Sequence, residues 1–214
     1  MLHMKKKMNS QELNNSIFLL QPSRPILCTT KNEDGSDHVA PFSWINPVSF
    51  NPPRIALALL TNPKKQKSLV NIERTGEFVI NMPDMKIADK MIEASYSTKF
   101  GENKFVRSGL TGEEASLVAP KIIGECQAHL ECRVLEIIEP GDHKLIIADV
   151  VGASYNQEAY GFDLHINTQN FQPVIHMNDY CLEGSQLHLL ANIQGTVALN
   201  VPYPSNNKDQ ECKK

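Results

Sequence analysis

The sequence lacks the short motifs that mark many common enzyme classes. It contains no GxGxxG dinucleotide fingerprint, no P-loop, no GxSxG nucleophile turn and no HExxH zinc motif. None of its seven histidines stands at metal-ligand spacing with cysteine or carboxylate partners, so no metal site is expected. These absences argue against those classes and make a bound organic cofactor the economical source of any chemistry.

The sequence also lacks a strong excess of charge of one sign, closely spaced cysteine pairs and long apolar runs. The formal net charge of the 214 residues is -3, which argues against a general nucleic-acid binder. No apolar run is long enough to span a membrane, and the lysines near the start precede no apolar segment of a secretory signal. The five cysteines form no CxxC pair, so we expect reduced thiols and a cytoplasmic location, with neither nucleic acid nor membrane as a partner.

What is present is the composition of a folded domain. Hydrophobic residues make up 41% of the chain and charged residues 21%, and a chain of this length can bury one sizeable core. We expect a flexible N-terminal tail over residues 1–15, a single domain over residues 16–204 and a disordered tail over residues 205–214.

Strand patterns dominate the part of the chain between the tails. Apolar or alternating segments separated by Gly, Pro, Asn and Asp turns predict strands that pair with their neighbours as hairpins. The pattern favours an antiparallel β-barrel with peripheral helices. The predicted strands cover residues 24–30, 37–40, 54–60, 77–81, 127–138 and 143–151, and the predicted helices cover residues 63–76 and 85–94.

The uncharged stretch APFSWINPVSFNPP over residues 40–53 is predicted to be a rigid loop. It holds the only tryptophan, Trp44, and its four prolines limit its conformational freedom. Ser43, Asn46 and Ser49 add hydroxyl and amide groups beside the aromatic rings. Such a loop suits a planar heteroaromatic ligand with a polar edge. The alternative is that its aromatic side chains fill the end of the barrel.

Lysines gather where the helix over residues 63–76 is predicted to begin. Lys64, Lys65 and Lys67 precede Ser68 there, although the positive end of the helix dipole disfavours cations. First-turn amides, lysines and a hydroxyl together would bind an anion, and a phosphate is the natural guest. The alternative is a solvated basic face that carries no ligand.

Five blocks of the sequence, in order, resemble the flavin reductase-like family. The resemblance runs from about Pro22 to Asp163 and implies a mainly β, six-stranded antiparallel FMN-binding split barrel of Greek-key type with peripheral helices. It also implies a homodimer, FMN near the subunit interface, and hydride arriving from NADH or NADPH. The blocks are Arg24-Pro25, VAPFSWINPVSFNPPRIAL, KSLVNIERTGEFVINMP, RSGLTGEEASLVAPKIIGECQAHLEC and GDHKLIIADVVGASY.

The resemblance also implies a set of site residues. Ser68 with Lys67 would hold the phosphate, and Lys104 would reach the flavin. His143 would lie beside the ring as the catalytic residue, whereas its pattern alone favours a hairpin residue that hydrogen-bonds locally. The isoalloxazine ring and ribityl chain would contact Ser43, Trp44, Ile45, Asn46, Val48 and Ser49.

The resemblance weakens over residues 172–180, where His176 takes the place of a family arginine. The electron acceptor and the choice between NADH and NADPH stay open. The basic residue is also shifted at Gln66-Lys67-Ser68, so the resemblance does not say which of Lys64, Lys65 and Lys67 meets the phosphate. Three functions follow as alternatives. They are an NAD(P)H-dependent flavin reductase using FMN, a flavoredoxin-type carrier fed by a redox protein partner, and a cofactor-less split-barrel binding protein.

Overall fold

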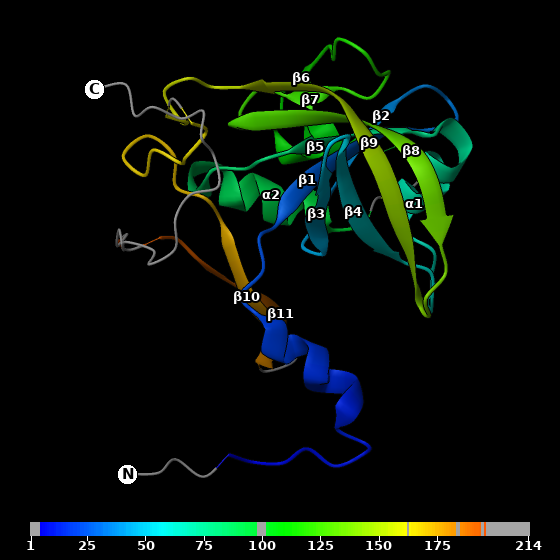
Figure 1. Cartoon of the computed structure of the whole chain (residues 1–214), viewed down its shortest axis with the longest axis vertical. Coiled ribbons are helices and arrows are strands. Elements are labelled where there is room, and N and C mark those ends of the chain that lie inside the picture. The colour runs from blue at the N-terminus through cyan, green and yellow to red at the C-terminus, as the bar shows by residue number, and fades with distance from the viewer. Residues whose placement is uncertain (1–4, 98–101, 162, 183–184, 194, 196–214) are drawn as a thin grey trace.

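The computed structural model in Figure 1 describes residues 5–97, 102–161, 163–182, 185–193 and 195. The expected tail over residues 205–214 lies outside these residues. The expected boundary at residue 15 falls inside a 3-10 helix, η1 (Leu13–Leu20), which projects away from the rest of the molecule. Among the helices of the described residues, none has the length and apolar character that a membrane crossing requires.

The main structure is a seven-stranded antiparallel sheet, so the mainly β prediction is confirmed, with seven strands where six were expected. Its strand order is β2-β1-β5-β8-β9-β4-β3. The hairpin predicted over residues 127–151 is present as the longest pair of strands in the sheet. The strands are β1 (Ile26–Lys31), β2 (Asp37–Phe42), β3 (Ile45–Phe50), β4 (Pro53–Leu60), β5 (Glu77–Asn81), β8 (Ala128–Ile138) and β9 (His143–Tyr155).

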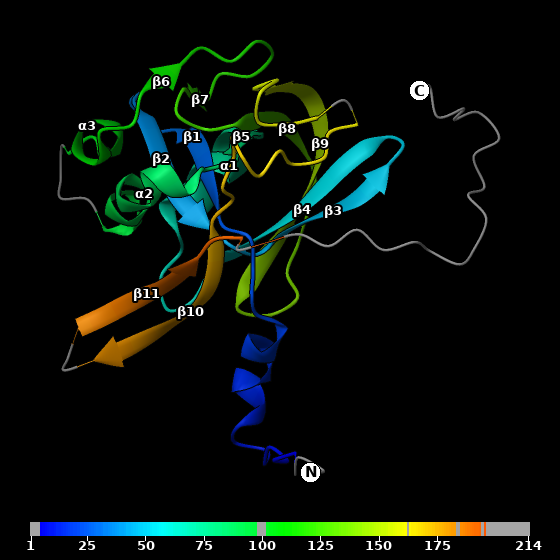
Figure 2. The same ribbon diagram turned by 90° about the vertical axis from the view of Figure 1, so that its left-hand side faces the viewer.

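The sheet has to curl, because its two edge strands are joined by a very short link. Strands β2 and β3 stand at opposite edges of the sheet, yet only Ser43 and Trp44 separate them in the chain. A flat sheet would hold these edges about 29 Å apart, at about 4.8 Å per strand spacing. Three Cα steps reach about 11 Å at most. The sheet therefore bends into a split barrel whose two edges meet at Ser43 and Trp44, which we call the seam (Figure 2).

The stretch over residues 40–53 is not a loop, and that prediction was wrong. Most of it forms the end of β2 and all of β3, which pairs with β4. The prolines suggested a loop because proline cannot donate to a sheet ladder. Pro47 is tolerated because β3 is an edge strand, where one side of the backbone needs no partner.

Helix α1 (Lys67–Thr75) starts later than predicted. Gln66 is its N-cap, and the Gln66 side chain accepts a hydrogen bond from Leu60 N at 2.9 Å. The Gln66 backbone N–H donates to Leu60 O at 3.2 Å. These bonds hold residue 66 to the end of β4. The helix therefore begins at Lys67, and Lys64 and Lys65 lie outside it. Gly76 ends the helix as predicted, with φ 70 and its N–H donating to Ile72 O at 2.8 Å.

Smaller elements surround the barrel (Figures 1 and 2). Asp84 caps the second predicted helix by accepting a hydrogen bond from Lys86 N at 2.9 Å, as its sequence position suggested. The helices are η2 (Met85–Ile87), α2 (Ala88–Ser95) and α3 (Lys104–Ser108). Two small antiparallel pairs complete the fold, formed by β6 (Gly112–Glu113) with β7 (Ile122–Ile123) and by β10 (Ile175–Leu182) with β11 (Ser185–Ala191).

The apolar core lies on both sides of the sheet. Along β1, Ile26 and Cys28 face one cluster while Leu27 faces another, as the two-residue period of a strand requires. The first cluster fills the barrel around Phe78 and α1. The second lies under α2 and α3. Burial on both faces explains why β1 reads as a nearly continuous apolar run.

Candidate functional site

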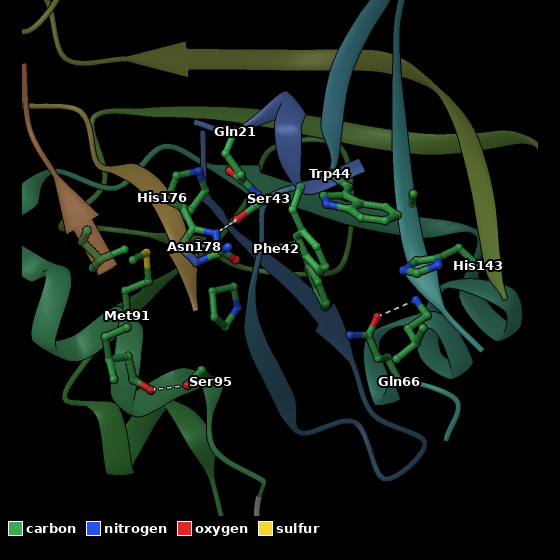
Figure 3. Close-up of a pocket in the computed structure, with 17 residues that line it drawn as sticks. Gln21, Phe42, Ser43, Trp44, Gln66, Met91, Ser95, His143, His176 and Asn178 are labelled. Carbon is green, nitrogen blue, oxygen red and sulfur yellow. Dashed lines mark hydrogen bonds between the residues drawn. The ribbon is translucent and has the colours of Figure 1, made fainter. Parts of the chain in front are cut away.

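A cavity of about 300 Å³ opens at the seam of the barrel. Its walls come from segments far apart in the sequence, namely the seam, the residue before α1, the start of β9, and β10 (Figure 3). The size matches the lower range of small-molecule pockets. The side chains that define its character are Phe42, Ser43, Trp44, Gln66, His143 and His176.

Trp44 and His143 form one wall of this cavity. Their rings are stacked, with centroids 4.5 Å apart and planes inclined by 22°. The imidazole Nδ1 lies 2.7 Å from Asp142 Oδ1, so in the neutral ring Nδ1–H donates to the carboxylate. Nε2 is then an acceptor when the ring is neutral and a donor when it is protonated. The flat apolar wall thus carries a hydrogen-bonding atom at its edge.

Ser43 and His176 form a second contact at the same cavity (Figure 3). Ser43 Oγ lies 3.4 Å from His176 Nδ1. The His176 backbone is fixed by two hydrogen bonds with Ser23, at 2.9 and 3.0 Å. His176, which takes the place of a family arginine, is therefore part of the cavity wall. Its contact with Ser43 was missed from the sequence, because 132 residues separate the two.

A second and much wider cleft, of about 1220 Å³, adjoins the seam cavity. The two spaces share four lining residues, Pro41, Phe42, Gln66 and Ser95, so they lie next to each other. The cleft extends from there between the start of α1 and the turn over residues 32–37, and it reaches the start of α3. A ligand with a ring at the seam can therefore extend a chain past Gln66 toward α1.

Ser68 lies at the point where that chain would arrive. The residue is 1% exposed, and its Oγ has no hydrogen-bond partner in the described part of the chain. A buried hydroxyl without a partner costs about 1–3 kcal/mol. It stands in the first turn of α1 and lines the cleft beside Lys67. First-turn amides, a hydroxyl and a lysine are the donors that bind phosphate.

Lys104 also lines the cleft, but it is committed to the protein. It is 7% exposed, and its Nζ donates to Ala94 O at 2.9 Å. Burial, and secondly the Arg107 cation, lowers its pKa to about 8. His38, on the same cleft, has its pKa lowered to about 4 by burial, with further contributions from Lys104 and Lys67. Near neutral pH the positive charge among the described residues that line the cleft therefore comes from lysines.

The predicted site residues fall into four groups. Ser43, Trp44 and His143 meet at the seam cavity, and Lys67, Ser68 and Lys104 line the cleft. Ile45 is buried in the barrel core. The rest, Asn46, Val48 and Ser49, continue along β3 and line neither space.

Gln66 was missed from the sequence, although it belongs to both spaces. Its position directly before the first helical residue is the signal that could have found it. Within the described residues, no group of three or more His, Cys, Asp or Glu side chains could hold a metal ion.

A curled antiparallel sheet with a ligand-sized cavity at its seam defines the class of split-barrel proteins. The chain belongs to the flavin reductase-like domain family, whose model matches residues 20–175. This membership supports the coarse assignment of the chain as a flavin-related oxidoreductase and confirms the resemblance of the five blocks.

Individual relatives agree with this family. An uncharacterized protein of Archaeoglobus fulgidus is 31% identical over 144 residues, which cover 67% of this chain and 78% of the relative. Nitrilotriacetate monooxygenase component B from Bacillus cereus has a similar structure, with a TM-score of 0.79 and 20% identity, covering 92% of this chain and 100% of that one. Flavoredoxin of Desulfovibrio vulgaris (Miyazaki F) has a TM-score of 0.72 and 20% identity, covering 92% and 97%. At these identities the two structures show the fold alone.

Proposed function

We propose that this protein is an FMN-binding, NAD(P)H-dependent flavin reductase. The observation that carries the proposal is that the two spaces adjoin. An aromatic-walled cavity shares Phe42 and Gln66 with a cleft where the buried hydroxyl of Ser68 has no partner within the described residues. FMN has the same order of parts, a flat ring, a polyhydroxylated chain and a phosphate.

The residues fit that cofactor group by group. The stacked wall of Trp44 and His143 offers apolar contact to a flat ring, and Ser43 offers a hydroxyl to its polar edge. Ser68 and Lys67, with the first amides of α1, would hold the phosphate. Bound FMN would supply the redox chemistry, taking hydride from a nicotinamide and passing electrons on. The side chains bind, orient and shield the ring, and none of them has to act as a nucleophile.

His143 is the residue we assign beside the ring. Asp142 holds its Nδ1 at 2.7 Å, which orients the ring and directs Nε2 away from the hairpin turn. A hydrogen bond from a protonated Nε2 would stabilise negative charge on a reduced ring system. The local contact through Nδ1 fits the hairpin interpretation, and the position of His143 at the cavity supports the assignment beside the ring.

Tryptophan fluorescence and absorption test the proposal together. Since Trp44 is the only tryptophan, emission from the whole protein reports on the cavity wall. Added FMN should quench it with a saturable curve, and Trp44→Phe should abolish the signal. The flavin band of the complex should bleach under anaerobic NADH or NADPH. Bleaching by dithionite alone would refute the reductase role and leave FMN binding intact. Colourless protein that takes up no FMN would indicate the cofactor-less alternative.

A flavoredoxin-type electron carrier is the second candidate. The specific observation in its favour is an exposed apolar surface close to the cavity. Phe18, which lines the cavity, is 46% exposed, and its neighbours Leu19 and Leu20 are 76% and 83% exposed on the projecting helix η1. Such a surface suits a protein partner or a second copy of the chain. A carrier would be reduced by a redox protein and show no saturable dependence on nicotinamide.

We also propose that the protein is a homodimer, as its family resemblance implies. None of the residues of helix η1 is fully buried, so packing within the single chain stabilises it little. Sedimentation equilibrium should give twice the 23.9 kDa chain mass. Leu19→Asp combined with Leu20→Asp should shift the mass toward the monomer, and an unchanged dimer would show that η1 lies outside the interface.

A further inference from the structure

Gln66 stands between the two spaces of the candidate site. It lines both the seam cavity and the adjoining cleft, at the end of the segment that joins β4 to α1. The seam cavity carries the stacked wall of Trp44 and His143, and the cleft carries the buried hydroxyl of Ser68. A ligand that reaches from this wall to this hydroxyl therefore passes the Gln66 side chain.

The protein holds Gln66 through both its backbone and its side chain. Its backbone N–H donates to Leu60 O at 3.2 Å, and its carbonyl accepts a hydrogen bond from Val70 N at 3.2 Å. Its side-chain Oε1 accepts from Leu60 N at 2.9 Å. Because three hydrogen bonds fix the residue, its amide group is ordered before a ligand arrives, which lowers the entropic cost of binding.

The bond to Leu60 also decides which way the Gln66 amide faces. A backbone N–H is a donor, so the side-chain atom that meets it is the oxygen. The amide nitrogen Nε2 therefore points the other way, and Figure 3 shows it on the side that faces Phe42. Nε2 makes no hydrogen bond within the described residues, and an amide nitrogen can only donate. The middle of the site thus presents a donor that requires an acceptor.

The donor at this point carries no charge. Lys65, which precedes Gln66, forms an ion pair with Glu73 of α1. Lys67, which follows Gln66, lines the cleft and not the seam cavity. A phosphate is bound best by the lysine and the first amides of the helix, whereas a carboxamide suits a neutral hydroxyl or carbonyl oxygen. The point between the two spaces therefore suits an uncharged acceptor.

We propose that Gln66 is a specificity-determining residue that recognises the hydroxylated chain between ring and phosphate, with Nε2 donating to a hydroxyl oxygen of that chain. The inference rests on the proposed function, because a ligand with its ring at the seam and its phosphate at Ser68 carries such a chain past Gln66. The side chain meets no reacting atom, so its effect falls on affinity and on the choice of ligand.

Three flavins that differ by one part at a time test this assignment. FMN has a ring, a chain and a phosphate, riboflavin lacks the phosphate, and lumiflavin lacks the chain as well. Gln66→Met removes the donor at similar volume. It should weaken the binding of FMN and riboflavin equally, by about fivefold, the scale of one neutral hydrogen bond. Lumiflavin binding, measured like the others by quenching of Trp44, should not change.

The contrary results each point to a different part of the ligand. A loss for FMN alone would place Gln66 at the phosphate, and a loss for all three flavins would place it at the ring. Either result would overturn the proposal, as would no loss at all. The emission of ligand-free Gln66→Met should match that of the wild type. A shifted emission would assign the effect of the substitution to the ring wall and would also overturn the proposal.

Gln66→Glu separates the donor from the bond that supports the fold. Glutamate keeps an oxygen for Leu60 N–H, so its urea midpoint should stay near the wild type while that of Gln66→Met falls. Riboflavin is uncharged and should bind both variants with the same reduced affinity, and full affinity in Gln66→Glu would contradict the role of the donor. Gln127→Met is the matched control. Gln127 Oε1 accepts from Asn156 Nδ2 at 3.0 Å outside both spaces, so every flavin affinity should stay unchanged.

The wild-type titration separates this inference from the proposed function. Saturable quenching by FMN, with unchanged riboflavin affinity in both Gln66 variants, overturns only the role of Gln66. Absence of quenching by all three flavins overturns the proposed function and the role of Gln66 with it.

Discussion

The indole of Trp44 lies stacked on the imidazole of His143, with ring centroids 4.5 Å apart. Strand β4 brings the two together, because Ala58 N donates to Trp44 O at 2.9 Å while Leu60 pairs with His143 across β9. The pair leaves no gap between its rings. A flat ligand therefore meets the edge or outer face of this wall and does not slot between the two side chains.

Replacing His143 separates the stacking role from the hydrogen-bonding role. His143→Ala should shift Trp44 emission to longer wavelength and weaken FMN binding by up to about tenfold, since an aromatic pair contributes about 0.5–1.5 kcal/mol. His143→Phe keeps a ring at this position, so emission and affinity should stay near the wild type. Reduction by NAD(P)H should slow in both variants, because both lack Nε2. If His143→Phe shifts the emission as much as His143→Ala does, stacking does not set the environment of Trp44.

Removing the Ser68 hydroxyl should weaken ligand binding without weakening the fold. The Oγ has no partner in the described chain, so Ser68→Ala should leave the free energy of unfolding of the apoprotein unchanged or slightly raised. FMN affinity should fall by about 2 kcal/mol, and by about 2–4 kcal/mol when Lys67→Ala is added. Urea unfolding and Trp44 quenching measure the two quantities.

Thr75→Ala is the matched control on the same helix. Thr75 Oγ1 donates to Asn71 O at 2.9 Å at the far end of α1, so this change should cost about 1 kcal/mol of stability and leave FMN affinity intact. A loss of stability in Ser68→Ala equal to that of Thr75→Ala would show that the Ser68 hydroxyl supports the fold instead.

Lys104 should make stability depend on pH in the alkaline range. Burial lowers its pKa to about 8 in the folded chain, against 10.5 for an ordinary exposed lysine. Between these values the unfolded chain binds the proton and the folded chain does not, so the free energy of unfolding should rise with pH across this window. Lys104→Met should flatten the rise. Urea midpoints at pH 7.5, 9 and 10 would test this, and equal slopes for both proteins would contradict the assignment.

Gly76 should matter for stability through its backbone conformation alone. Its φ is +70, and a Cβ built there meets nothing within 4 Å. Gly76→Ala should therefore cost about 1 kcal/mol from left-handed strain without any steric clash. Gly141→Ala is the matched control, because that position is equally open and lacks the positive φ. Chemical denaturation should distinguish the two variants. An equal loss of stability in both would show that the positive φ of Gly76 is not the cause.

The sequence predicted the fold well where local pattern and burial agree. Alternation placed the hairpin over residues 127–151, and Gly76 marked the end of a helix, because both signals are local. The prediction failed for β3. Its prolines suggested a loop, because only the sheet order shows that this strand lies at an edge. The hairpin of β10 and β11 was missed as well, since residues 172–180 departed from the family pattern.

The candidate site could be predicted only in part. Sequence blocks singled out Ser43, Trp44, Ser68 and His143 through resemblance, and the fold gathers them at two adjoining spaces. Hydrogen bonding to β4 determines which residues of the stretch after the seam point inward. No local feature of the sequence distinguishes Trp44 from Val48 in this respect. The contact between Ser43 and His176 joins distant segments, so it required the tertiary structure.

The two-residue seam leaves the chain no slack between β2 and β3. An inserted residue would both loosen the closure of the barrel and displace Ser43 and Trp44 from the cavity that they line. The turn between β8 and β9 is exposed, but its Asp142 lies 2.7 Å from His143 Nδ1, so a change of length there would also disturb the cavity wall. We therefore expect length variation to be excluded at the seam, where one joint serves both the architecture and the ligand cavity.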